Sequence, residues 1–138
     1  MTDSLTAAER SERMALIHGR DTKPEMKVRR LVHGMGFRYR LHRRDLPGVP
    51  DLVFPSRRKV IFVHGCFWHQ HARCTQYRQP KTKLDFWEPK LRENKLRDAR
   101  HRKALTRLGW ESLVVWECQL KRLDRLAARL QRFLEGSQ

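Results

Sequence analysis

Residues 60–74, VIFVHGCFWHQHARC, constrain the fold of this chain more than any other segment. They begin as an apolar strand and then place two cysteines, three histidines and a Phe-Trp pair in one turn. A second apolar run, 52–54, is joined to this strand by the turn-forming residues 55–58. The two runs therefore predict a β-hairpin. Such a hairpin would hold Asp51, which precedes its first strand, near the histidine-rich turn.

The flanking segments predict further strands and helices. Residues 22–25, TKPE, form a capping-box pattern with Pro in the first turn, and an apolar stripe follows as far as Met35. Alternation over 37–41 predicts a half-buried strand, and 70–86 reads as a polar loop. The remaining predictions are helices over 4–18, 88–108 and 120–134 and a buried strand over 110–116.

This order indicates one α/β domain of 138 residues with a mixed β-sheet flanked by helices. A strand, a crossover helix and a further buried strand predict a parallel pair within that sheet. We expect residues 1–19 to form an N-terminal arm or helix, and residues 20–138 to form the main domain.

The charge favours a polyanionic partner. Lys and Arg number 31 against 15 Asp and Glu, which gives a net charge of +16. Nucleic acid is the favoured partner, with general solubility or an anionic membrane surface as alternatives. No apolar run reaches the length of a bilayer span, and residues 1–13 do not form an export signal, so we expect a cytoplasmic, nucleoid-associated protein without a membrane partner.

The cysteines suggest a structural zinc site. Cys66, His71 and Cys74 fall within nine residues, and Cys118 follows the expected buried strand 110–116. Together they would form the closed Cys₃His arrangement of structural zinc. The alternative is that Cys118 is a buried core thiol and that the other two cysteines are incidental. Three cysteines in a chain without an export signal argue against a disulfide framework.

The hairpin also carries a candidate catalytic site. Pro50-Asp51 is placed like the first acid of PD-(D/E)XK nucleases, but 62–64, FVH, lacks the second acid. The backbone carbonyl of Val63 could replace that acid in holding Mg²⁺. His69 is the better candidate for a base, and His64 could hold a water or a phosphate oxygen, or orient a neighbour.

Each of these residues also has a plainer interpretation. Asp51 could be a turn-capping acid, and Glu25 is explained by helix capping alone. His64 and His69 could be alternative zinc ligands. Phe67 and Trp68 suit either a small core around the zinc or wedges between base steps, and Trp87 could serve as a packing residue at a helix start.

The motifs taken together resemble the very-short-patch-repair (Vsr) DNA mismatch endonucleases. The similarity runs in order from about residue 10 to residue 120, and its most specific block is 64–71. It rests on RDTKPE (20–25), LPGVPD (46–51), HGCFWHQH (64–71), DFW (85–87) and GW…VVWEC (109–118). The resemblance implies a PD-(D/E)XK restriction-endonuclease-like fold with structural zinc. It also implies a Mg²⁺-dependent nick on the 5′ side of the thymine in a T·G mismatch left by deamination of 5-methylcytosine.

The resemblance assigns a role to each motif residue. Only the backbone carbonyl is required at Val63, where some family members have Thr. The implied catalytic residues are Asp51 as the metal-binding aspartate, His69 as the catalytic histidine, His64 as a supporting histidine and Glu25 as an acid near the site. The implied zinc ligands are Cys66, His71, Cys74 and Cys118, and the implied DNA-intercalating residues are Phe67, Trp68 and Trp87.

The expected partner is double-stranded DNA that contains a T·G mismatch, with mismatch-repair proteins and a repair polymerase as further partners of a monomeric enzyme. Two other functions remain open at this point. One is a zinc-stabilised protein that binds nucleic acid without cutting it, and the other is a restriction-type nuclease that cuts both strands. A carboxylate, Asp51, beside a histidine that zinc does not need, His69, favours an enzyme.

Overall fold

The computed structural model describes residues 22–66 and 84–136, and it contains the expected elements in the expected order. The predicted helix over 4–18 lies outside these residues. The elements are α2 (Lys23–Gly34), β1 (Arg40–Leu41), β2 (Leu52–Phe54), the 3₁₀ turn η1 (Pro55–Arg57), β3 (Lys59–His64), α3 (Leu84–Arg107), β4 (Glu111–Trp116), the 3₁₀ turn η2 (Glu117–Lys121) and α4 (Leu123–Glu135).

In the described part of the chain the strands form one mixed sheet in the order β1-β2-β3-β4. The β2–β3 hairpin is antiparallel, and Leu52 pairs with Ile61. Its turn closes at Arg58, which adopts the left-handed conformation with φ 54°. β3 and β4 run parallel and are linked through α3. Both the predicted hairpin and the predicted parallel pair are therefore confirmed.

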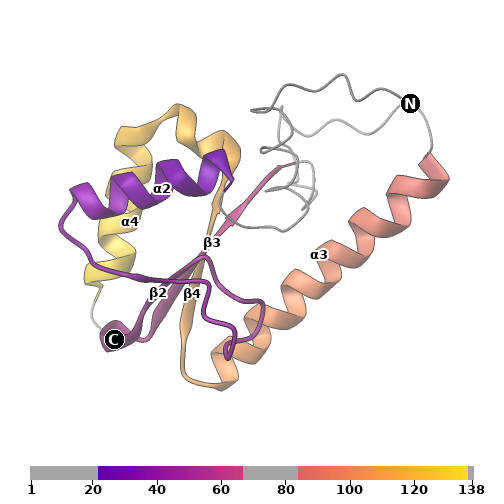
Figure 1. Ribbon diagram of the computed structural model, residues 1–138, viewed down its shortest axis with the longest axis horizontal. Coiled ribbons are helices and arrows are strands. Elements are labelled where there is room, and N and C mark those ends of the chain that lie inside the picture. The colour runs from indigo at the N-terminus through magenta and orange to yellow at the C-terminus, as the bar shows by residue number, and fades with distance from the viewer. Residues whose placement is uncertain (1–21, 67–83, 137–138) are drawn as a thin grey trace, which may run out of the picture.

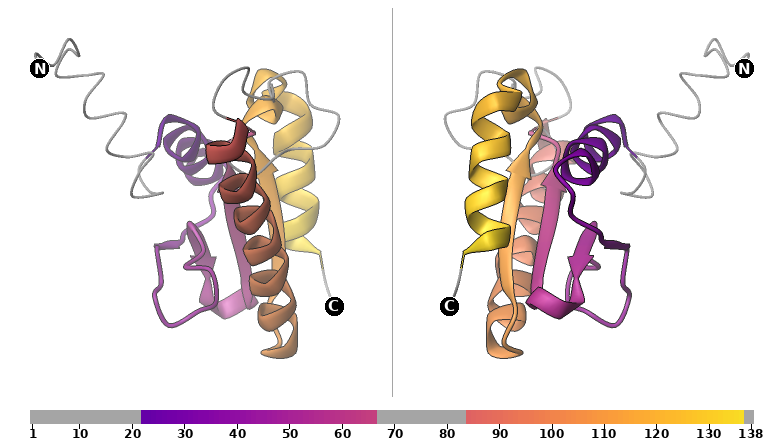
Figure 2. Two further views of the ribbon diagram at one scale, coloured as in Figure 1. Left: turned by 90° about the vertical axis from the view of Figure 1, so that its right-hand side faces the viewer. Right: turned by 90° about the vertical axis from the view of Figure 1, so that its left-hand side faces the viewer.

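Helices cover both faces of the sheet: α2 and α4 lie on one face and α3 lies on the other (Figures 1 and 2). Two apolar clusters match this arrangement. Val28 of α2 and Leu130 of α4 belong to the first cluster, and Leu105 of α3 belongs to the second. β3 supplies both clusters because its side chains alternate between the two faces: Ile61 joins the first and Phe62 the second. β3 is therefore an interior strand to which both apolar clusters are packed.

The long helix α3 differs from its predicted form at both ends. It begins at Leu84 and runs across Pro89, so the last residues of the predicted loop 70–86 are helical. The predicted helix 88–108 would end with Leu108 turned inward. Leu108 is instead 52% exposed, because the helix ends at Arg107 and the chain turns at Gly109. Within the described ranges no helix is both long and apolar enough to span a membrane.

The other expected segments also have shorter regular cores than predicted. β1 comprises two residues, not five, and Leu41 is 41% exposed although the alternation placed it on the buried side. The helix expected over 120–134 begins as η2 and becomes α-helical at Leu123. Of the apolar stripe that predicts this helix, Leu126, Leu130 and Leu134 are buried, whereas Leu123 is 49% exposed at the first position of α4.

A buried lysine anchors α4 to the hairpin. Lys59, 3% exposed at the start of β3, donates hydrogen bonds to the carbonyl oxygens of Phe133 at 2.5 Å and Gly136 at 2.8 Å. Arg57 of η1 donates to the carbonyl of Leu134 at 2.8 Å. The last carbonyls of a helix have no partner within the helix, so these cations satisfy them and also complement the helix dipole.

Candidate active site

Asp51 lies at the point where the hairpin opens towards the end of β3. It directly precedes β2, and its side-chain Oδ2 accepts a hydrogen bond of 2.7 Å from the backbone N–H of Val63. The residue is buried, with 8% of its surface exposed. The hairpin therefore ties this carboxylate to β3. The expected nearness of Asp51 to the histidine-rich turn stays a prediction, because residues 67–74 of that turn lie outside the described structure.

Glu25 reaches the same place from α2. The helix begins here because the Thr22 hydroxyl caps it, accepting the Glu25 N–H at 3.3 Å, and Pro24 suits the first turn. The Glu25 side chain is 1% exposed. Its Oε2 atom accepts a hydrogen bond from Arg29, one turn further along the helix, and contacts Nε2 of His42 at 2.9 Å.

His42 is a site residue that the sequence did not reveal. Leu41 pairs with Leu52, so the next residues outward, His42 and Asp51, face each other, and the His42 N–H donates to the Asp51 carbonyl at 3.4 Å. Its Nε2 lies 3.9 Å from Oδ1 of Asp51. Ligand atoms of Glu25, His42 and Asp51 all lie within 4.8 Å of one another. We call these three residues the carboxylate–histidine cluster.

Burial has the largest effect on the pKa of Asp51 in this cluster. Burial raises the pKa of the Asp51 carboxyl well above its ordinary value, and the neighbouring charge of Glu25 raises it further. The Val63 N–H and the Arg29 guanidinium act in the opposite direction on the pKa. Two buried carboxylates beside each other repel when both are ionised. A divalent cation between them would offset that repulsion, and oxygen ligands of this kind suit Mg²⁺.

His64 occupies the last position of β3 and is 5% exposed. Its ring meets Trp116, its partner on β4, edge-on with 5.2 Å between ring centroids. Its Nδ1 lies 4.0 Å from Oδ2 of Asp98 on α3. Asp98 is a second residue that sequence reasoning missed, because within the charged run of α3 nothing distinguishes it from a solvated acid.

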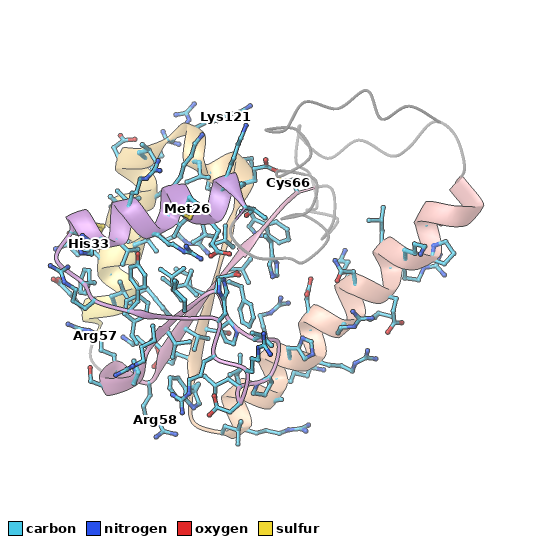
Figure 3. The ribbon with its side chains drawn as sticks, viewed as in Figure 1. Met26, His33, Arg57, Arg58, Cys66 and Lys121 are labelled. Atoms are coloured by element: carbon cyan, nitrogen blue, oxygen red, sulfur yellow. The ribbon has the colours of Figure 1, made fainter. Side chains whose placement is uncertain are left out.

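Two of the four expected zinc ligands lie within the described structure. The parallel ladder ends with His64 opposite Trp116, so Cys66 and Cys118 each follow two residues beyond the last pair, at the same end of adjacent strands. Cys66, two residues after β3, is buried, and Cys118 in η2 is half-buried. Figure 3 shows Cys66 beyond the end of the strand. The other two expected ligands, His71 and Cys74, lie outside the described residues, so the zinc site stays a prediction.

Of the remaining predicted site residues, the structure describes two and leaves three outside its described ranges. Val63 is a half-buried β3 residue, and Trp87 belongs to the first turns of α3, although its side chain is not among those described. His69, Phe67 and Trp68 lie outside the described residues.

Comparison with known proteins gives consistent matches. The family described as "DNA mismatch endonuclease Vsr" matches residues 2–76. The type II nicking enzyme V.XorIIP of Xanthomonas oryzae pv. oryzae is 50% identical over 137 residues, which cover 99% of this chain and 100% of that protein. The DNA mismatch endonuclease Vsr of Escherichia coli K12 is 42% identical over 126 residues, 91% of this chain and 80% of that protein.

A solved structure has the same fold. The catalytic domain of the homing endonuclease I-Bth0305I superposes with a TM-score of 0.56, covering 82% of this chain and 94% of that chain. The two sequences are 18% identical, so this likeness concerns the fold alone.

Proposed function

Because this chain belongs to the Vsr family of DNA mismatch endonucleases, we propose that it nicks one strand of duplex DNA on the 5′ side of the thymine in a T·G mispair. The nick is Mg²⁺-dependent and initiates very short patch repair of deaminated 5-methylcytosine. The observation that carries the proposal is the convergence of two buried carboxylates, Glu25 and Asp51, at the end of β3. A protein that only binds DNA has no need of such a pair.

Asp51 and the backbone carbonyl of Val63 are the proposed Mg²⁺ ligands, in a PD-(D/E)XK-like arrangement without the second acid. In a strand, the N–H and C=O of one residue point to the same side. The Val63 N–H is directed at Asp51, so its carbonyl faces that side as well, which supports the assignment. A bound divalent cation would supply charge stabilisation for the phosphate oxygens during cleavage.

The histidines have separate proposed roles. His69 accepts a proton from the attacking water as general base, which is the role that the family resemblance gives it. His64 is a supporting histidine: its ring packs against Trp116 of β4 and its Nδ1 lies 4.0 Å from Asp98 of α3, which supports a role in orienting a water or a phosphate oxygen. Glu25 faces Asp51 and helps to set the charge at the metal-binding carboxylate.

We further propose that structural zinc, held by Cys66, His71, Cys74 and Cys118, fixes the turn that carries His69. The position of Cys66 and Cys118 at the ends of adjacent parallel strands supports this arrangement. A closed Cys₃His site has no open position, so this zinc has no part in hydrolysis. Phe67, Trp68 and Trp87 are proposed to insert beside the mismatch, where unstacking costs least.

The proposed partner is double-stranded DNA with a T·G mismatch, recognised by a monomer that carries a net charge of +16, and mismatch-repair proteins and a repair polymerase act after the nick. The test uses two labelled duplexes that differ by a single T·G or T·A pair, incubated with the protein and Mg²⁺. We expect one nick, in the thymine strand, 5′ of the mismatch. Cleavage of both strands, or equal cleavage of the two duplexes, would contradict the proposal.

A further inference from the structure

His42 has no role in the reaction as proposed above, yet it is built into the site. It is fixed by the β1–β2 register opposite Asp51, and its backbone adopts the left-handed conformation with φ 45°. This conformation is uncommon for a residue with a side chain. The ring nitrogen Nε2 lies 2.9 Å from Oε2 of Glu25 and 3.9 Å from Oδ1 of Asp51.

We infer that His42 is a metal ligand, and that the carboxylate–histidine cluster holds Mn²⁺ more tightly than Mg²⁺. The inference rests on the proposed metal role of Asp51 and deepens it by naming the class of cation. Mg²⁺ prefers oxygen ligands and keeps much of its water, whereas imidazole nitrogen suits first-row transition ions. Mn²⁺ takes the same carboxylate oxygens as Mg²⁺ and, as the first member of the transition series, gains more than Mg²⁺ does from an added imidazole nitrogen.

The competing explanation is that His42 serves only as a hydrogen-bond partner of Glu25. Arg29 contacts the same Oε2 atom and lies 3.4 Å from Nε2 of His42, so the carboxylate is already held from its own helix. A residue that merely positions Glu25 would affect every divalent cation alike. A ligand nitrogen would affect Mn²⁺ selectively, and this difference can be measured without DNA and without turnover.

The experiment titrates the protein as purified with Mn²⁺ at about pH 8, where an ordinary histidine is neutral. The paramagnetic resonance signal of the free ion gives the Mn²⁺ affinity, and competition gives the Mg²⁺ affinity. The test variant is His42→Asn, because asparagine tolerates the left-handed backbone. The matched control is His33→Asn, which makes the same change at an exposed histidine at the end of α2 (Figure 3).

We expect His42→Asn to weaken Mn²⁺ binding about 10-fold or more and Mg²⁺ binding less than about 3-fold, since loss of even an outer partner of a metal site costs roughly 10–100-fold. His33→Asn should leave both affinities unchanged. Equal weakening of both ions, or unchanged Mn²⁺ affinity, would overturn the inference.

A second measurement does not depend on how the variant folds. Pulsed paramagnetic resonance of Mn²⁺ bound to the wild-type protein should show coupling to an imidazole nitrogen, and its absence would also overturn the inference. If the protein binds Mn²⁺ in this way but does not nick T·G duplexes with either ion, the proposed function fails while the metal site stands. If the protein nicks T·G duplexes but does not bind Mn²⁺ more tightly than Mg²⁺, the proposed function stands and the inference about His42 fails.

Discussion

The backbone N–H of Val63 donates a 2.7 Å hydrogen bond to the side chain of Asp51, so the first strand of the hairpin holds its carboxylate against the end of the second. Twelve residues separate the two in sequence, and the antiparallel register brings them together. Asp51 is thus positioned by β3, an interior strand of the sheet. A site on rigid strands keeps its geometry better than one on loops.

Asp51→Asn should abolish nicking and leave the fold intact. The amide keeps the size of the side chain and can still accept from the Val63 N–H, but it removes the charge that holds a cation. Because charge stabilisation by a metal is worth several kcal/mol and each 1.4 kcal/mol is about tenfold, we expect the rate of nicking to fall at least about 100-fold. Single-turnover nicking and duplex binding would be measured side by side. Nicking within about threefold of wild type would contradict the role of Asp51 as metal ligand.

The raised pKa of Asp51 predicts how stability depends on pH when divalent cations are chelated. The folded state binds the proton of the Asp51 carboxyl more tightly than the unfolded state does. The contribution of Asp51 to the free energy of unfolding is therefore fully present below its ordinary pKa. It is lost as the pH rises through the raised value. The unfolding free energy of wild type should therefore fall relative to Asp51→Asn with rising pH. Chemical denaturation at a series of pH values measures this difference.

Asp45 supplies a matched control of opposite sign. Arg43 donates to its carboxylate at 2.8 Å and lowers the pKa of Asp45. Any stability that Asp45 contributes is present above its ordinary pKa and is lost as the pH falls through the lowered value. Relative to the Asp45→Asn variant, wild type should therefore not lose unfolding free energy as the pH rises.

Added Mg²⁺ should increase the unfolding free energy of wild type more as the pH rises, because the cation competes with the proton for Asp51.

Lys59→Met should destabilise the protein without altering the chemistry of the site. It removes two hydrogen bonds from a buried cation to the end of α4, at the carbonyls of Phe133 and Gly136. Hydrogen bonds to charged groups are worth about 1.5–3 kcal/mol, so a loss of this size is expected in denaturant titrations. The control is Lys121→Met, at an exposed position of η2, which should stay within about 0.5 kcal/mol of wild type (Figure 3). A loss as small as that of the control would contradict the anchoring role of Lys59.

The sheet could be predicted because its signals are local. The turn residues 55–58 fix the hairpin, and the apolar runs on either side of α3 predict the parallel pair. Asp51 could be singled out for the same reason, since it directly precedes a strand. Its hydrogen bond to Val63 follows from the register that this turn imposes.

His42, Asp98 and Lys59 could not be predicted, because their roles depend on partners distant in sequence. His42 follows a two-residue strand, and its positive φ, which the sequence does not signal, takes it out of the simple alternation. Asp98 is one acid among many charges on α3 and differs only in lying near His64. Lys59 looks like a solvated turn residue until α4, more than seventy residues later, ends beside it. The roles of all three residues are set by packing between segments that are distant in sequence.

The zinc prediction concerns folding. Purified protein should contain one equivalent of tightly held zinc, and Cys118→Ser should release it and strongly lower the thermal midpoint, since structural zinc is coupled to folding. Metal analysis and thermal denaturation of both proteins measure these effects. A metal-free sample of unchanged stability would rule out the four-ligand assignment. Retained zinc in Cys118→Ser would exclude this cysteine alone.

The last prediction separates a mismatch enzyme from a basic nuclease. Contacts from a surface with a net charge of +16 act alike on paired and mismatched duplexes and weaken steeply with salt. Selectivity must therefore come from groups that sense how easily a base step opens, and the proposed wedges include Trp68 and Trp87. Each change to Ala should reduce T·G nicking by about 1–3 kcal/mol, the range of one base–aromatic stack, while salt-dependent binding to matched DNA stays nearly constant. If both variants keep the full preference of wild type for T·G over T·A, these tryptophans pack inside the protein and the wedge proposal is wrong.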